Sequence, residues 1–208
     1  MSRQILPVSD NQDKKHTYQY NIRRYNKAMK EGFYYEALLI DYAMMEDRLR
    51  SFLYHMGLLN TRDSHKADVG KVKKSLKEIM QTYKRPEEND NFNIKSISGK
   101  MKIVRCTLLW AEQELEGCND KYLLSLRNQY DKYIDAERLL NAFDDIENWC
   151  SYRNEIIHAL MNKNIESTYK DIATKAEEGM RLCRELDAQV ARLKTGNRIR
   201  KSIKLQNK

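Results

Sequence analysis

Glycine and proline are scarce in this sequence, since its 208 residues include 7 glycines and 2 prolines. These numbers are far below the usual shares of about 7% and 5%. Tight turns between strands depend on both residue types, so their scarcity excludes a turn-rich β fold and favours long helices. No apolar run approaches the roughly 18 residues of a membrane-spanning helix, and residues 1–16 contain no apolar segment typical of a secretory signal. We therefore expect a cytoplasmic protein without a membrane partner.

Cysteine is also sparse and scattered. The four cysteines form no C-x-x-C pair, and they are Cys106, Cys118, Cys150 and Cys183. Their spacing predicts neither a zinc site nor a disulfide framework, so we expect free thiols and no metal or other cofactor. Acidic residues number 30 against 38 basic ones, which gives a net charge of +8. This charge is compatible with a polyanionic partner such as RNA but does not demand one.

The apolar residues recur with helical spacing along most of the chain, and Gly32 and Gly57 are placed to end the first two helices. The predicted helices cover 14–31, 33–56, 66–84, 100–116, 119–135, 136–162 and 166–195, and the fifth and sixth are candidates for one continuous helix. The polar segment 84–99 is the clear internal break. The sequence thus predicts an all-α, up-and-down bundle of about six to seven helices. We expect a disordered leader at 1–13, a single domain at 14–195 and a basic tail at 196–208.

The predicted third helix is strongly basic. Residues 66–85 hold seven Lys or Arg against two acids. A charged helix face is usually a solvated face, but the same lysines are candidates for contact with RNA phosphates. The candidate RNA-binding residues are Lys71, Lys73, Lys74 and Lys77.

The candidate catalytic residues lie on the helix predicted at 136–162. Its apolar stripe runs Leu139, Phe143, Ile146, Cys150, Arg153, Ile157 and Leu160, so an arginine interrupts it. Burying a guanidinium without a partner costs several kcal/mol, so Arg153 needs a carboxylate or an anion. Asn154 and His158 are four residues apart and share the adjacent face. Together the three side chains are suited to holding a phosphate and moving a proton beside it.

The spacing R-N-x-x-x-H is specific for a chain of this composition, because about 0.02 matches are expected by chance. Arg50 and His55 have the same separation but lack the asparagine, and Glu46 and Arg50 form an ordinary i,i+4 pair. A structural role for Arg153 remains an alternative, in which it pairs with a carboxylate. The carboxylates available for such a pair are Glu46, Asp145 and Glu147.

The segment R153-N154-E155-I156-I157-H158, followed by Ala159 and Leu160, resembles the signature of the HEPN superfamily. The helix at 35–49 resembles the long core helix of that family, with Glu46 as the acidic residue on its inner face. The resemblance implies a HEPN-like bundle and a metal-independent endoribonuclease from a toxin, abortive-infection or CRISPR-associated defence system. It also implies RNA as substrate, a homodimer with a shared cleft, and an antitoxin or defence-complex partner.

In the mechanism that the resemblance implies, His158 is the general base or acid, Arg153 holds the phosphate, and Asn154 orients His158 or the phosphate. Two histidines in a dimer allow one to act as base and the other as acid, giving 2′,3′-cyclic phosphate and 5′-hydroxyl ends. Two alternatives stay open. One is a catalytically silent HEPN-like module that binds RNA, nucleotide or a protein. The other is a helical scaffold in which the motif is accidental.

Overall fold

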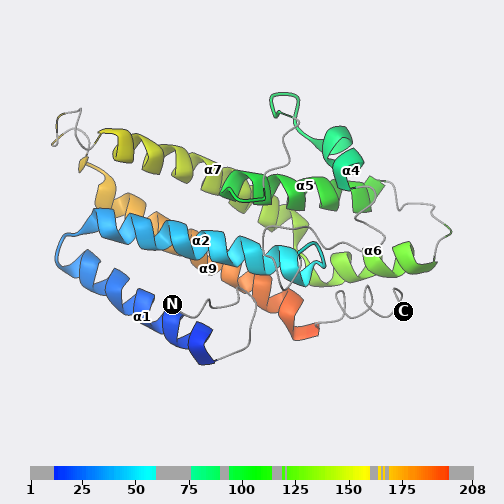
Figure 1. Cartoon of the computed structure of the whole chain (residues 1–208), viewed down its shortest axis with the longest axis horizontal. Helices are drawn as coiled ribbons and strands as arrows, with labels where there is room; N and C mark the ends of the chain where they lie inside the picture. Colours follow the sequence, from blue (N-terminus) through cyan, green and yellow to red (C-terminus); the bar gives the residue numbers. More distant parts are fainter. Residues whose placement is uncertain are drawn as a thin grey trace, which may run out of the picture.

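A computed structural model describes residues 12–59, 76–89, 94–113, 119, 121–159, 164, 166 and 169–196. Its helices are α1 (Gln12–Lys30), α2 (Tyr34–His55), α4 (Leu76–Tyr83), α5 (Ile97–Gln113), α6 (Lys121–Tyr133), α7 (Ala136–Ala159) and α9 (Ile172–Gly196). The described residues form these seven helices and no strand, so the predicted all-α bundle is confirmed (Figure 1).

The core is built around α2 and α9, which lie side by side along the long axis of the molecule (Figure 1). Helix α1 packs on α2, and α7 packs on both α9 and α5. The apolar residues that recur with helical spacing in α2 are fully buried at Leu38, Met45, Leu49 and Phe52. Each such side chain contributes roughly 1.5–3 kcal/mol of hydrophobic free energy on burial. None of the described helices combines the length and the apolar character that a membrane span requires.

Two glycines end helices as predicted. Gly32 has φ 77°, and the Phe33 amide donates to the Ala28 carbonyl oxygen at 2.8 Å. Gly57 has φ 84° and sits in the same kind of turn at the end of α2. Only glycine adopts such left-handed backbone at no steric cost, and the pattern is a Schellman cap.

Side-chain caps mark the starts of two helices. Helix α5 begins at Ile97 rather than at residue 100, because the Ser96 hydroxyl accepts a hydrogen bond from the Gly99 amide at 3.0 Å. Asp135 accepts a hydrogen bond from the Arg138 amide at 3.3 Å, and this cap starts α7 separately from α6. The predicted fifth and sixth helices are therefore two helices.

A close approach between α2, α7 and α9 occurs at Gly179. A Cβ at that position would lie 2.6 Å from Asp41 Oδ2 and 2.8 Å from the Trp149 ring. Glycine is thus required sterically, since real Cβ atoms do not make contacts below 3.0 Å. Trp149 and Asp41 are completely buried where these three helices meet.

Residues 1–11 and 197–208 lie outside the described part, and so does most of the predicted third helix. Helix α4 is the described portion of the helix predicted at 66–84. Lys71, Lys73 and Lys74 are therefore not placed, and Lys77 is placed only by its backbone in α4.

Candidate functional site

The candidate site occupies the C-terminal half of α7. Trp149, Ile156 and Ala159 are buried there, so the buried face has rotated relative to the predicted stripe. An α-helix drifts by about 20° per heptad against a strict 3.5-residue repeat, which explains the shift. Arg153 consequently lies at the edge of the buried face and is half-buried, not in its centre as predicted.

Asn154 and His158 are both exposed, one turn apart on α7. Residues at this spacing share a helix face, so the amide and the imidazole are presented to solvent together. The described structure therefore brings the three motif residues to one surface of the bundle. It does so on a regular helix, which fixes their relative positions.

Arg153 is held by an aromatic ring of the neighbouring helix α2. Its guanidinium carbon lies 4.2 Å from the centroid of the Tyr42 ring, and its Nη1 donates to Asn154 Oδ1 at 3.1 Å. A cation over an aromatic face gains about 0.5–2 kcal/mol and keeps its charge. Burial raises the pKa of Tyr42, and the charge of Arg153 opposes that rise. The contact therefore positions the guanidinium without neutralising it.

The alternative in which Arg153 pairs with Glu46, Asp145 or Glu147 is wrong. Glu46 is paired with Lys100 at 3.1 Å, Asp145 with Arg181 at 3.1 Å and Glu147 with Arg85 at 3.0 Å. Arg153 makes no ion pair within the described part of the chain, and its buried Nε has no hydrogen-bond partner. An unpaired buried donor costs about 1–3 kcal/mol. This guanidinium thus retains its charge, which no carboxylate of the described residues neutralises.

Glu46 has a different role from the one expected. Its Oε1 accepts hydrogen bonds from Arg50 at 2.9 Å, as predicted, and from Lys100 at 3.1 Å. The Lys100 side chain is 1% exposed, and its burial lowers the pKa of the ammonium while Glu46 opposes that shift. Glu46 therefore stabilises a buried lysine of α5 and does not contact Arg153.

Cys150 lies one turn before Arg153 on α7. Burial raises the pKa of its thiol to about 11, although the Arg153 charge acts in the opposite direction. A thiol with this pKa is protonated at neutral pH and is a poor nucleophile. The side chains suited to chemistry here are accordingly the motif residues and not the thiol.

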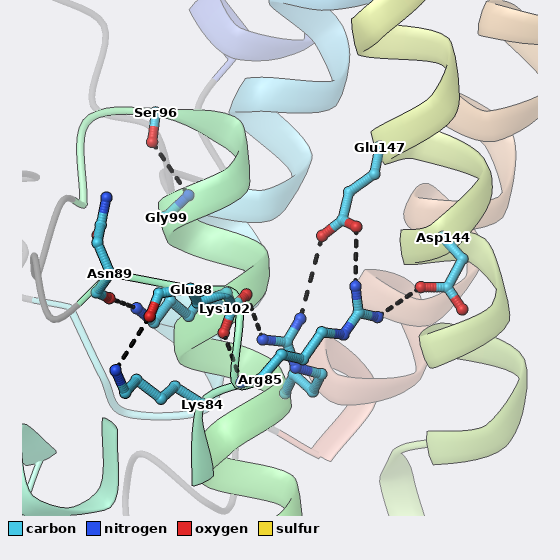
Figure 2. Close-up of polar contacts among 10 residues, drawn as sticks. Lys84, Arg85, Glu88, Asn89, Ser96, Gly99, Lys102, Asp144 and Glu147 are labelled. Carbon is cyan, nitrogen blue, oxygen red and sulfur yellow. Dashed lines mark hydrogen bonds and ion pairs between the residues drawn. The ribbon is translucent and has the colours of Figure 1, made fainter. Parts of the chain in front are cut away.

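A network of ion pairs fixes α7 to the loop that follows α4 (Figure 2). Arg85 bridges to Asp144 at 2.6 Å and to Glu147 at 3.0 Å, both on α7. Glu88 pairs with Arg105 of α5 at 2.5 Å, and the Arg85 amide donates to Glu88 at 2.9 Å. The described part of the predicted loop 84–99 thus connects α5 and α7 through ion pairs of Arg85 and Glu88. It fixes the position of α7 along the bundle and thereby that of the motif.

Comparison with protein-family models, with curated proteins and with solved structures finds no match. Among the residues that the structure describes, no three His, Cys, Asp or Glu side chains are grouped so that they could hold a metal ion. The functional argument therefore rests on the residues of the site.

Sequence reasoning missed two parts of this site. Tyr42 recurs at helical spacing with the apolar residues of its helix, and nothing in the sequence indicates that its ring contacts Arg153. Arg85 lies 62 residues before Glu147 in the sequence. Arg85 belongs to the basic segment 66–85, but its pairing with Asp144 and Glu147 depends on how the helices pack.

Proposed function

We propose that this chain is a metal-independent, HEPN-type endoribonuclease that cleaves single-stranded RNA. The observation that carries the proposal is the state of Arg153. Its guanidinium is positioned by Tyr42 and carries no ion pair among the described residues. Such preorganised charge stabilises a phosphate as it becomes more negative in the transition state. The R-N-x-x-x-H spacing supplies the independent second argument.

In the proposed reaction, one His158 accepts the proton of the ribose 2′-hydroxyl. The 2′-oxygen attacks phosphorus, the bond to the 5′-oxygen breaks, and a second imidazole donates a proton to that leaving oxygen. Arg153 binds the non-bridging oxygens, and Asn154, through its contact with Arg153, fixes the guanidinium. The products are a 2′,3′-cyclic phosphate and a 5′-hydroxyl.

The two imidazoles are proposed to come from two copies of the chain. Leu39 lies three residues before Tyr42 on α2 and is 39% exposed, so an apolar side chain accompanies the motif at the surface. A two-fold dimer through this surface would place the same residues of both copies in one cleft. We propose a toxin or anti-phage defence role for such an enzyme, with an antitoxin or defence-complex protein as its regulator.

The experiment is a cleavage assay on labelled single-stranded RNA with EDTA present, followed by analysis of the product ends. The parent is expected to give 2′,3′-cyclic phosphate ends, and His158→Ala is expected to give none. His16→Ala is the matched control, because His16 is an exposed histidine on α1. His55 is less suitable because it is 8% exposed and its removal would leave a cavity. RNA binding without any cleavage by the parent would instead support the silent binding module.

A further inference from the structure

A second site lies at the end of the bundle that carries His158. The end of α7, the turn between α1 and α2 and the start of α9 all meet at that end (Figure 1). A cavity of about 360 Å³ opens there. It is lined by Phe33, Tyr34, Tyr35, Glu36, Tyr169 and Ile172. Ligand cavities begin at about 300 Å³, so this one has room for a single small group.

The lining of this cavity is predominantly aromatic. The Schellman turn at Gly32 holds Phe33 with 59% of its surface exposed, although burial would favour a phenyl ring. Tyr35 from the first turn of α2 and Tyr169 from the segment before α9 are half-buried in the same wall. Rings from two distant parts of the chain therefore converge on one open cavity.

Charged residues of both signs lie in the segments around the cavity. The exposed lysines are Lys27 and Lys30 in the last turn of α1 and Lys170 before α9, and the exposed acids in the same segments are Glu31 and Asp171. Aromatic rings combined with neighbouring cations are the arrangement by which proteins hold single-stranded nucleic acid, with bases stacked and phosphates attracted.

We infer that this cavity binds one unpaired nucleobase of the RNA substrate, an inference that rests on the proposed ribonuclease function. The ring of the base stacks on the aromatic wall, and the lysines attract the flanking phosphates. Glu36 supplies a carboxylate whose Oε1 accepts a hydrogen bond from Arg24. A carboxylate accepts hydrogen bonds from amino groups of bases, so the cavity favours a base with an exocyclic amine over uracil.

The position of the cavity suits a subsite of the Arg153 centre. Tyr35 in the cavity and Tyr42 beneath Arg153 are seven residues apart on α2, which corresponds to about 10 Å along the helix axis. A stacked strand advances about 3.4 Å per nucleotide, so roughly three nucleotides span this distance. One strand can therefore occupy the cavity and present a phosphate to Arg153.

The test measures binding separately from cleavage. Affinity for a fluorescein-labelled oligoadenylate is measured by anisotropy in a His158→Ala background, which prevents degradation. Phe33→Ala is expected to weaken binding roughly 5- to 100-fold, which is the effect of removing one stacked ring. Phe33→Trp is expected to retain it, and oligouridylate should bind more weakly than oligoadenylate. Tyr20→Ala is the control, because Tyr20 is 60% exposed on α1 and lines no part of this cavity.

Each outcome decides one of the two proposals. Equal affinity of Phe33→Ala and Tyr20→Ala, with RNA cleaved by the parent, would overturn the cavity assignment and leave the ribonuclease proposal intact. Phe33-dependent binding without cleavage by the parent would support the cavity and overturn the nuclease. Full RNA binding by Phe33→Leu would show that stacking on an aromatic ring at this position is not needed and would overturn the nucleobase assignment. Because Phe33 is largely exposed, thermal melts should show all these variants folded.

Discussion

The guanidinium of Arg153 lies 4.2 Å from the centroid of the Tyr42 ring, and no carboxylate of the described chain pairs with it. The ring belongs to α2 and the arginine to α7, so the contact exists only when the two helices are packed. It combines two properties that rarely occur together, a fixed orientation and an unneutralised charge. Tyr42 is accordingly a positioning residue for Arg153.

Replacing this ring should impair cleavage without removing any group that touches RNA. Tyr42→Leu is expected to lower the cleavage rate about 2- to 30-fold, since a cation–π contact of about 0.5–2 kcal/mol is lost. Tyr42→Phe keeps the aromatic face and should restore the parental rate. The rates are measured under single-turnover conditions on the same RNA. A Tyr42→Phe variant as slow as Tyr42→Leu would show that the hydroxyl, and not the ring face, matters.

The proposed dimer leads to a second prediction, which concerns Leu39 of α2. Leu39→Asp places a charge on an apolar side chain that is 39% exposed beside the motif. The variant is expected to be a folded monomer with no cleavage activity, because each site then lacks the second imidazole. Sedimentation velocity and circular dichroism check this. Ile22→Asp is the matched control, since Ile22 is 40% exposed on α1, and it should remain dimeric. An active monomeric parent would overturn the composite site.

Asp41 presents an unusual buried carboxyl group. The residue is 0% exposed, and neither carboxyl oxygen has a hydrogen-bond partner. The donors around it are used elsewhere, because Trp149 Nε1 donates to the Lys175 carbonyl oxygen at 2.7 Å and Cys183 Sγ donates to the backbone oxygen of Asp41 at 3.3 Å. Burial therefore raises the pKa of Asp41 to about 8. The folded protein holds this group protonated at neutral pH.

This pKa makes stability depend on pH. The folded-state pKa of about 8 exceeds the unfolded value of 3.8, so the folded state binds the extra proton between these values. The stabilising contribution is complete below pH 3.8 and is lost as pH rises through 8. The melting temperature should thus fall between pH 5 and pH 9. Asp41→Asn should reduce that slope and raise the melting temperature at pH 9.

The control for this prediction is Asp131→Asn, because the Asp131 side chain is 68% exposed. It should keep the parental pH dependence. Identical slopes for Asp41→Asn and the parent would show that Asp41 ionises in the folded protein with an ordinary pKa.

Much of the fold could be predicted from the sequence because its signals are local. Glycine scarcity and helical periodicity indicated the all-α bundle, and Gly32 and Gly57 marked the helix ends that the structure has. The sequence left open whether the predicted helices 119–135 and 136–162 are one helix, because apolar spacing continues across Asp135 and the cap that separates them is a single side-chain hydrogen bond. Local patterns thus predict elements better than their boundaries.

The candidate site was predictable only in part. The motif residues could be found because Arg153, Asn154 and His158 are close in sequence and their spacing is improbable by chance. Their environment could not be found, because Tyr42 is more than 100 residues away in the chain and the buried face of α7 rotates along its length. The pairing of acids with other cations, which leaves Arg153 unpaired, is likewise a property of tertiary packing.

The final prediction separates chemistry from folding with two arginines in opposite environments. Arg153→Ala should abolish cleavage and change the free energy of unfolding by less than about 2 kcal/mol, because the cation–π contact of about 0.5–2 kcal/mol is lost but no carboxylate loses its partner. Arg105→Ala is the contrasting variant, since the Arg105 side chain is 6% exposed and pairs with Glu88 at 2.5 Å. Breaking that buried pair should cost about 3–5 kcal/mol. Urea unfolding and RNA cleavage are measured on both variants. A loss of several kcal/mol in Arg153→Ala would show that this arginine holds the bundle together, and the case for a phosphate-binding cation would fail.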